Sequence, residues 1–560
     1  MTKRALTLLL LSLLVAVLLV ACGAPQEVVE PTQAPTAEPT EVMVPFEALP
    51  ALMTEPCTGA FKEIAAVDQY TVRFTTCNPD PAFLSKIAFS AFAIYPEEYL
   101  NATGGTGDML EKPIGTGPYL LESWERGSSI IFTRNESYWG EKAIAPKLVF
   151  RWNSEASARL VELQSGQVDG IDNPSPDDFE SIQADSSLML MKRPALNTFY
   201  IGMTNTFAPW DEVAVRQAIA MGIDRQRIVD TFYPAGSEVA THFTPCAIAN
   251  GCAGDAWYDY NPDKARELLA QAGLQDGFKT KLYYRDVVRG YLPEPGVVAQ
   301  DIQAQLKDLG IEVEIEVQES GTFLDNASNG RLDGLYLLGW GADYPHITNF
   351  LDFHFGAAGQ RFGTPFPEIY EQLQAGAQIA DAAAAEDIYI KANNAIRELV
   401  PMVPVAHGGS ATAYRADVEG GQASPLTNEV FSVVNPGGRD TMVWMQNAEP
   451  LSFFCADESD GESLRACEQV QEALYGYEVG GTAPVPALAT ACTPSEDLTV
   501  WTCALRQGVM FHDGSEFDAN DVLATFKAGL DYTDPNHKGN TGTFDYYANL
   551  WGIINAPAQP

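Results

Sequence analysis

The chain has 560 residues, which is enough for three or four domains of about 150 residues each. Apolar residues make up 46% of the chain and charged residues 19%, so a large core is possible and a wholly disordered chain is excluded. The 74 acidic residues outnumber the 34 basic ones and give a formal net charge of −40. Because binding to a phosphate backbone needs Lys and Arg, we expect no nucleic-acid partner.

The first 22 residues have the pattern of an export signal. Lys3 and Arg4 precede an apolar run over residues 5–20, which is short for a membrane span and suits a signal peptide. The run ends in Leu-Val-Ala-Cys and resembles a bacterial lipobox, in which Cys22 becomes the lipidated first residue of the mature protein. The alternative is an ordinary signal peptide with a chance cysteine.

Residues 23–56 follow as a Pro-rich stretch that also contains Thr, Glu and Ala. Such a composition cannot form a core and predicts an extended, disordered tether. We therefore expect an extracytoplasmic protein, on the cell surface or in the periplasm. A lipid on Cys22 would anchor it to the cell membrane without a spanning helix.

Eight further cysteines fall as close neighbours along the chain. An even number in an exported chain indicates disulfides, although eight cysteines allow 105 pairings. Local pairing is the simplest arrangement, and residues 492–503 are typical of a hairpin whose end cysteines face each other. Zinc is the alternative, but no spacing is a CxxC pair, so we expect no metal. The expected pairs are Cys57 with Cys77, Cys246 with Cys252, Cys455 with Cys467, and Cys492 with Cys503.

The globular part contains mixed α and β signals in chain order. Residues 68–74 alternate as a half-buried strand. Residues 261–273 have a capping Asn, a Pro at the first helical position and a terminal Gly, which predict a helix. Residues 279–317 read as strand, amphipathic helix and alternating strand, which is one βαβ unit. Residues 386–399 predict another helix. The fold class is therefore α/β, in more than one lobe.

Seven stretches resemble the extracytoplasmic solute-binding proteins of the peptide/nickel type, known as bacterial solute-binding protein family 5, which serve ABC importers. Each stretch is moderately specific alone, but together they span nearly everything from residue 57 onward. They are KPIGTGPY at 112–119, FTRNESYWG at 132–140, RLVELQSGQVD at 159–169, VRQAIAMGIDR at 215–225, YNPDKA at 260–265, GWGADYP at 339–345 and LRQGVMFHDG at 505–514.

The order of these stretches differs from that of the family. The HDG segment normally lies near the mature N-terminus, but here it lies at residues 511–514. Residues 440–446 resemble the family's opening strand and follow the linker-like residues 435–438. This order indicates a circular permutation within one copy, which is tolerated where termini lie close together. A tandem array cut at both ends is the alternative. We favour permutation because the signal and tether directly precede the new start.

The resemblance implies a two-lobed periplasmic-binding-protein-like clamp with mixed sheets and an extra α/β domain. Residues 57–112 plus 486–560 would form the extra domain from both chain ends. Lobe 1 would comprise 113–242 plus 412–485, and lobe 2 would comprise 243–411. Closure around a ligand would signal occupancy to the membrane permease. We expect a monomer that captures di- or oligopeptides and delivers them to an ABC permease.

The resemblance also indicates a ligand site around Asp343, because this Asp holds the ligand's α-ammonium in peptide-binding members. An enclosed cation needs such a carboxylate partner. Trp340 and Tyr344 would provide aromatic walls, and His346 could touch the ligand. The alternative is that Asp343 only caps the turn before Pro345.

The loop at 457–463 should also face the cleft, with Asp457, Ser459 and Gly461 as candidates. It resembles a loose calcium loop as well, but Gly461 is one place early for that pattern. No motif locates an Arg for a ligand carboxylate, so the sequence leaves the choice between peptides and other solutes open.

The sequence gives little support for an enzymatic function. It contains no GxGK[ST] loop, HExxH or GxSxG elbow. We expect no enzyme and no cofactor. The alternatives are the same fold binding a nickel chelate or an oligosaccharide, or serving as a sensory co-receptor. An extracellular hydrolase is the least favoured alternative.

Overall fold

A computed structural model describes residues 46–53, 57, 59–286, 289–357 and 359–555. The expected signal peptide at 1–22, Cys22 and most of the expected tether lie outside these residues. None of the helices in the described part of the chain is long and apolar enough to cross a membrane. The described chain contains three larger sheets and one two-stranded ribbon.

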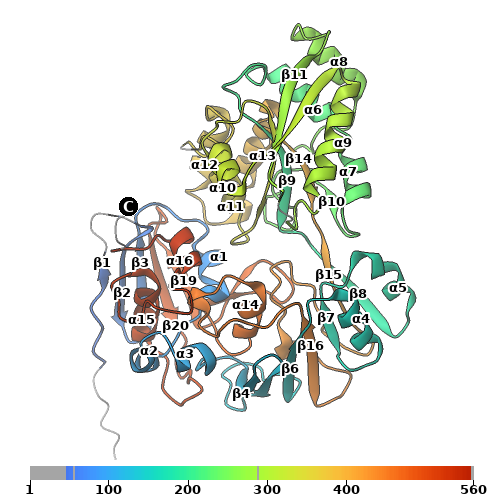
Figure 1. The fold of residues 1–560 in the computed structure, drawn as a ribbon. Coiled ribbons are helices and arrows are strands. Elements are labelled where there is room, and N and C mark those ends of the chain that lie inside the picture. Colours follow the sequence, from blue (N-terminus) through green and yellow to red (C-terminus); the bar gives the residue numbers. More distant parts are fainter. Residues whose placement is uncertain (1–45, 54–56, 58, 287–288, 358, 556–560) are drawn as a thin grey trace, which may run out of the picture. The chain divides into compact units, whose positions relative to one another are not determined.

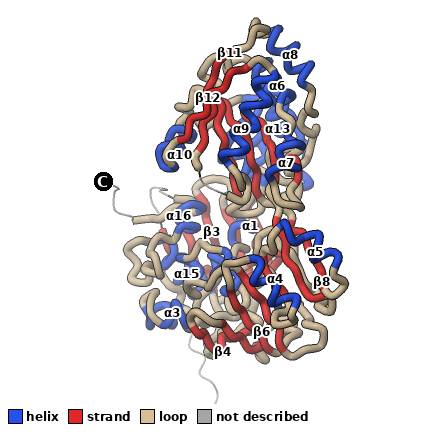
Figure 2. The backbone as a smooth tube through the Cα atoms, turned by 45° about the vertical axis from the view of Figure 1, so that its right-hand side comes forward, coloured by secondary structure: helices blue, strands red, loops and turns tan. Residues whose placement is uncertain are grey.

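A six-stranded mixed sheet has the order β10-β14-β9-β13-β11-β12. Helices α6–α9 lie to one side of its strands in Figure 1, and α10–α12 lie to the other. Figure 2 shows α6–α10 from a direction turned by 45°. The strands are β9 (Asn197–Met203), β10 (Glu238–Val239), β11 (Phe278–Tyr284), β12 (Ile311–Val317), β13 (Leu335–Gly341) and β14 (Met402–His407). The helices are α6 (Val213–Gly222), α7 (Arg225–Phe232), α8 (Pro262–Gln271), α9 (Pro295–Asp308), α10 (Ser320–Ser328), α11 (Ile347–Phe355), α12 (Pro367–Gly376) and α13 (Ala382–Leu399).

The predicted βαβ unit is confirmed in this sheet. β11 and β12 pair in parallel from Phe278 opposite Ile311 to Tyr284 opposite Val317, with α9 between them in sequence. The helix expected at 261–273 is α8, whose cap Asn261 accepts a hydrogen bond from the Lys264 N–H at 3.0 Å. The helix expected at 386–399 begins earlier, because Asp381 caps α13 by accepting from the Ala384 N–H.

A seven-stranded sheet has the order β4-β5-β6-β16-β7-β15-β8. β16 lies between β6 and β7 and runs parallel to both, although it follows them by hundreds of residues in the sequence. The strands are β4 (Tyr119–Glu125), β5 (Ser129–Arg134), β6 (Lys147–Trp152), β7 (Gly170–Asp172), β8 (Leu188–Arg193), β15 (Ser410–Arg415) and β16 (Thr441–Gln446). The helices near it are α4 (Ala156–Gln164), α5 (Phe179–Ala184) and α14 (Gly461–Cys467).

A five-stranded sheet contains strands from both ends of the chain, in the order β1-β2-β3-β20-β19. In Figure 1 the blue β3 lies beside the red-brown β20, and the two pair antiparallel. The strands are β1 (Leu52–Met53), β2 (Phe61–Asp68), β3 (Thr71–Thr76), β19 (Ala489–Pro494) and β20 (Val500–Leu505). The helices are α1 (Phe83–Ile87), α2 (Glu97–Thr103), α3 (Asp108–Glu111), α15 (Ala519–Leu530) and α16 (Asp545–Leu550), and the ribbon is β17 (Tyr475–Tyr477) with β18 (Pro484–Pro486).

Two sequence expectations need correction. Residues 68–74 do not form one strand, because the Asp68 side chain accepts a hydrogen bond from the Tyr70 N–H at 2.9 Å and the chain turns there between β2 and β3. The lobe boundary expected at residue 242 also falls too late. β9 is paired between β14 and β13 and is buried over most of its length, so the chain enters the six-stranded sheet at Asn197.

The four local disulfides predicted from the cysteine spacing are present. Cys57 pairs with Cys77, Cys246 with Cys252, Cys455 with Cys467 and Cys492 with Cys503. The expected hairpin is formed by β19 and β20, in which Cys492 lies directly opposite Cys503.

Candidate functional site

The chain crosses between the seven-stranded and six-stranded sheets twice, and a cavity of about 540 Å³ lies at these crossings. We call it the cleft cavity. Residues 193–197 lead from β8 into β9, and residues 408–410 lead from β14 into β15. The end of β13 reaches the cavity from the six-stranded sheet. The cavity is lined by Arg193, Asn197, Arg289, Gly341, Ala342, Asp343, Gly408, Ser410, Thr427, Asn428, Ser459, Gly461, Arg465, Glu468 and Tyr546, among others.

Asp343 lies just after β13, where it lines both the cleft cavity and a second cavity. Burial raises the pKa of its carboxyl above the ordinary value, and a hydrogen bond from Asn349 counteracts part of this rise. Asn349 Nδ2 donates to Asp343 Oδ2 at 3.1 Å. The carboxylate is thus half-buried, held by one side chain, and placed where a cationic ligand group could reach it.

Trp340 and Tyr344 line the second cavity, which we call the side cavity and which measures about 590 Å³. Trp340 stacks on Phe353 with ring centroids 4.2 Å apart, and the Tyr344 hydroxyl lies 3.2 Å from the Thr348 hydroxyl. These two residues therefore do not line the cleft cavity. Ser459 and Gly461 do, on the wall opposite the six-stranded sheet.

His346 and Asp457 lie outside the lining of both cavities. His346 caps α11, where its Nδ1 accepts a hydrogen bond from the Thr348 N–H at 3.3 Å. Asp457 is buried and accepts hydrogen bonds from the backbone N–H groups of residues 541–544 and from the Thr541 hydroxyl. Its oxygens therefore hold the loop before α16 in place.

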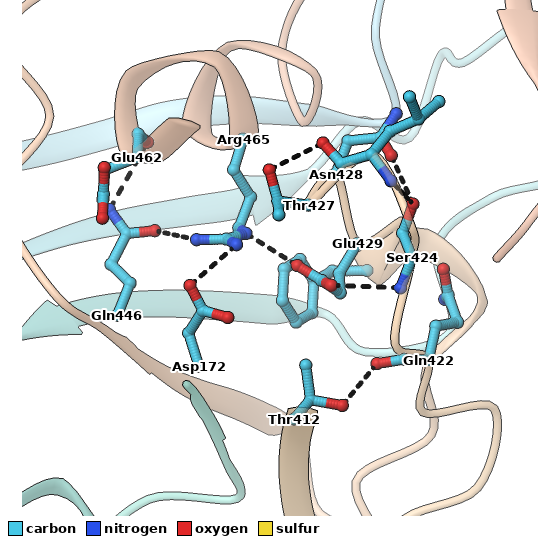
Figure 3. Close-up of polar contacts among 12 residues, drawn as sticks. Asp172, Thr412, Gln422, Ser424, Thr427, Asn428, Glu429, Gln446, Glu462 and Arg465 are labelled. Carbon is cyan, nitrogen blue, oxygen red and sulfur yellow. Dashed lines mark hydrogen bonds and ion pairs between the residues drawn. The ribbon is translucent and has the colours of Figure 1, made fainter. Parts of the chain in front are cut away.

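Two arginines on the wall of the cleft cavity belong to a buried ion cluster. Arg193 Nη2 lies 3.0 Å from Asp172 Oδ1 and 2.6 Å from Glu429 Oε1. Arg465 Nη2 lies 2.9 Å from Asp172 Oδ2, and its Nε lies 2.7 Å from Glu429 Oε2. Figure 3 shows Arg465 between Asp172, Glu429 and Gln446. All four charged side chains are at most 3% exposed.

The electrostatics of this cluster are balanced internally. Burial alone would raise the pKa of the Asp172 carboxyl, but the Arg465 and Arg193 guanidinium groups hold it below its ordinary value. With two cations and two anions in mutual contact, the cluster carries no net charge when all four groups are ionised. Its role in the described fold is to hold β7, β8, α14 and the loop at 424–429 together beside the cavity.

Two further charged residues of the cleft cavity have no motif in the sequence. Arg289 is exposed on the six-stranded side. Glu468 follows α14, and burial raises the pKa of its carboxyl to about 7, although Asn428 donates a hydrogen bond to Oε1 at 3.2 Å. The cavity thus combines an exposed basic group, Arg289, with the partly buried carboxyl groups of Asp343 and Glu468, which suits a ligand that carries both charges.

Comparison with known proteins identifies the family. The model described as "Bacterial extracellular solute-binding proteins, family 5 Middle" matches residues 28–362 and 483–549. The chain belongs to this family. As a family 5 protein it is the solute-binding component of an ABC importer and acts outside the cytoplasm. The prediction that it is not an enzyme is confirmed, because these proteins are transport components.

Three relatives illustrate the family 5 similarity. Di/tripeptide-binding protein 1 of Pseudomonas aeruginosa, strain UCBPP-PA14, is 30% identical over 398 residues, which are 68% of this chain and 72% of the relative. The dipeptide-binding protein of Escherichia coli, strain K12, is 29% identical over 384 residues, 67% of this chain and 71% of the relative. The solved structure of HbpA2 from Haemophilus parasuis has a TM-score of 0.62 and 30% identity, and the match covers 67% of this chain and 75% of that one.

Proposed function

We propose that this protein captures di- or oligopeptides in the cleft cavity and delivers them to an ABC permease. The observation that carries the proposal is the presence of Asp343 and Arg289 in the lining of one cavity. A peptide with free ends carries an ammonium and a carboxylate, and these two side chains offer the matching charges. The relatives named as di/tripeptide- and dipeptide-binding proteins support the same ligand class.

Arg289 is our candidate for the ligand carboxylate because of its exposure. Arg193 and Arg465 also line the cavity, but each is ion-paired with Asp172 and Glu429 and at most 3% exposed. Recruiting either of them would break a buried pair, which typically costs about 3–5 kcal/mol. Arg289 is exposed and can meet a carboxylate with two parallel hydrogen bonds.

A calorimetric cycle tests the assignment of Asp343. The ligands are trialanine and its N-acetylated form, and the proteins are the wild type and Asp343→Asn. Removing the countercharge should weaken binding of trialanine by about 2–5 kcal/mol, which is roughly thirty-fold to several-thousand-fold. The acetylated peptide should bind the wild type poorly and lose little more in the variant. Asp263→Asn, which removes a charge from exposed α8, is the matched control.

The same design with Arg289→Gln and C-terminally amidated trialanine tests the other end of the ligand. If the wild type and both variants bind trialanine and its blocked forms with equal affinity, peptide capture is contradicted. The ligand would then be an oligosaccharide, a metal chelate or another solute without charged termini. Mass spectrometry of the solute released from the purified protein would identify that ligand. A membrane kinase as the partner, instead of a permease, would indicate that the protein is a sensory co-receptor.

We also propose that the chain is a circular permutation of the family order, with three domains in one monomer. Residues 57–112 plus 486–560 would form the extra domain, residues 113–196 plus 409–485 would form lobe 1, and residues 197–408 would form lobe 2. The pairing of β3 with β20 and of β16 with β6 supports this proposal, because each joins segments that are far apart in the sequence. The alternative is a tandem array cut at both ends, in which the two parts would pair with neighbouring modules or chains.

Membrane anchoring through a lipid on Cys22 is part of the same proposal. It rests on the lipobox-like residues 19–22 and the Pro-rich stretch that follows. Cys22→Ala should release the protein from the membrane fraction, and mass spectrometry of the mature N-terminus should find the lipid on the wild type. An unmodified N-terminus would contradict it.

A further inference from the structure

The side cavity adjoins the cleft cavity at Asp343 but is built from different elements. Its walls are the segment after β3, the segment from the end of β13 into α11, and the end of α16. Three carboxylates line it, those of Asp80, Asp343 and Asp352, against the single ammonium of Lys86. With all of these groups ionised, the lining carries an excess of negative charge.

Asp352 lies on this lining with one buried carboxyl oxygen. Its Oδ1 is out of contact with solvent, and among the described residues nothing hydrogen-bonds to this atom. Burial raises the pKa of the carboxyl to about 7, and Lys86 counteracts this only in part. A buried carboxylate oxygen without a hydrogen bond is costly, so a cation that came close to this carboxyl group from the cavity would be favoured.

Aromatic rings form the wall beside Asp352. Trp340 and Phe353 are stacked, and Phe353 is 50% exposed although it is a large apolar side chain. Two of the protein's own cations already lie over rings in this region. Lys86 Nζ is 5.1 Å from the centre of the Tyr344 ring, and the Arg361 guanidinium is 5.4 Å from that of Phe353. Rings with negative faces next to carboxylates attract cations with an apolar body.

We propose that the side cavity is a binding site for an organic cation, an amine whose ammonium pairs with Asp352 and whose apolar body lies against Trp340 and Phe353. Lys86 partly neutralises the site, because it pairs with Asp80 at 2.7 Å and lies on the same cavity wall. The amine can come from two sources. It is either a free small amine or the basic side chain of a peptide whose α-ammonium is held at Asp343.

Benzylamine and benzyl alcohol, which differ in charge at nearly equal size, are the probes for the free amine. The wild-type protein should bind benzylamine at least about tenfold more tightly than benzyl alcohol in calorimetry. Asp352→Asn should abolish this difference. Lys86→Met removes the competing cation and should tighten benzylamine binding by about threefold or more. Asp263→Asn removes a carboxylate on exposed α8 and should change neither affinity.

Lys-Ala-Ala and norleucine-Ala-Ala are the probes for the peptide side chain, and only this arm rests on the proposed peptide capture. If the peptide supplies the cation, the Lys peptide should bind the wild type at least about tenfold more tightly. Asp352→Asn should equalise the two peptides. If the cation is a free amine, the two peptides should bind alike, and benzylamine should still distinguish the wild type from Asp352→Asn.

The two proposals can fail separately. If no peptide binds but benzylamine depends on Asp352, peptide capture fails and the cation site stands. The cation site is overturned if the wild type prefers neither benzylamine nor Lys-Ala-Ala over its neutral counterpart. It is also overturned if such a preference persists in Asp352→Asn. Circular dichroism and thermal unfolding of each variant show whether a lost preference reflects a lost fold. Phe353→Ala, which shortens an exposed side chain on the same wall, gives an independent variant with the same expected loss of benzylamine affinity.

Discussion

Asn349 holds Asp343 from two sides. Its Nδ2 donates to Asp343 Oδ2 at 3.1 Å, and its Oδ1 accepts from the Asp343 backbone N–H at 3.2 Å. The same Oδ1 accepts from Trp340 Nε1 at 2.9 Å. One buried amide on α11 therefore fixes both the carboxylate shared by the two cavities and the aromatic wall of the side cavity.

Asn349→Ala should weaken peptide binding through Asp343 without changing any charge. The variant leaves the Trp340 indole N–H and the Asp343 N–H without their acceptor, which typically costs about 1–3 kcal/mol of stability. The loss of affinity for trialanine should be smaller than in Asp343→Asn, because the countercharge remains. Calorimetry and urea unfolding measure the two effects. Asn329→Ala is the control, because Asn329 is exposed and hydrogen-bonds to Asp325. If Asn349→Ala binds trialanine as tightly as the wild type, Asp343 does not depend on Asn349 for its position.

The sequence predicts local structure well where the signal is itself local. The alternation of residues 311–317, the cap at Asn261 and the pairing of Cys492 with Cys503 each depend on neighbours in the chain, and all three are present. The turn at Asp68 was missed because residues 68–74 alternate in the sequence, whereas Asp68 ends β2 and its side chain accepts from the Tyr70 N–H in the turn before the antiparallel β3.

The sites depend on contacts between distant segments, which no short motif records. Asp172, Arg193, Glu429 and Arg465 come from four separate stretches and meet only after the sheet is assembled. The position of Asp343 at a cavity could be expected from the resemblance of residues 339–345 to the family. The side cavity could not, because Lys86 on α1 and Asp352 on α11 come from segments that are far apart in the sequence.

Arg465→Met should be strongly destabilising. It removes one of the two cations that compensate Asp172 and Glu429, which are at most 3% exposed. Breaking a buried pair on one side typically costs about 3–5 kcal/mol. Arg266→Met breaks an exposed pair with Asp263 and should cost less than about 1 kcal/mol. Urea unfolding of both variants measures the difference, and similar midpoints would mean that the cluster contributes little.

His346 should make the protein less stable in mild acid. Burial lowers the pKa of its imidazole from 6.5 to about 4, and the neutral ring is needed to accept the Thr348 N–H. Between these two pH values the unfolded chain binds a proton that the folded chain does not, so stability is present above pH 6.5 and is lost as the pH falls towards 4. The full effect of such a shift is about 3 kcal/mol.

His346→Asn isolates this contribution. Asn is a good helix cap and does not titrate, so the helix end should be retained while the pH dependence is reduced. The other buried histidines are present in both proteins, and their effects cancel in the difference between wild type and variant. Chemical unfolding at several pH values between 7 and 4 gives that difference. A constant difference over this range would show that His346 titrates normally.

The two ends of the chain should fold as one unit. β3 lies between β2 and β20, and the core behind this sheet joins early and late residues. Phe74 and Phe526 have ring centroids 5.2 Å apart, and Phe83 and Trp501 are 5.0 Å apart. A fragment that ends at residue 485 therefore loses β20, one of the two partner strands of β3, and exposes the rings of Phe74 and Phe83.

We expect that fragment to bind a hydrophobic dye and to lose cooperative unfolding of its N-terminal part, because one edge of β3 and the aromatic core behind it would be left uncovered. Co-expression of residues 46–485 and 486–560 as two chains should restore the cooperative transition, because the second chain returns β20 to its place beside β3. Light scattering of the intact protein should give a monomer mass at all concentrations. A mass that rises with concentration would mean that the two chain ends pair between molecules, as in a tandem array. If the fragment that ends at residue 485 unfolds like the intact protein, the two chain ends do not form one folding unit.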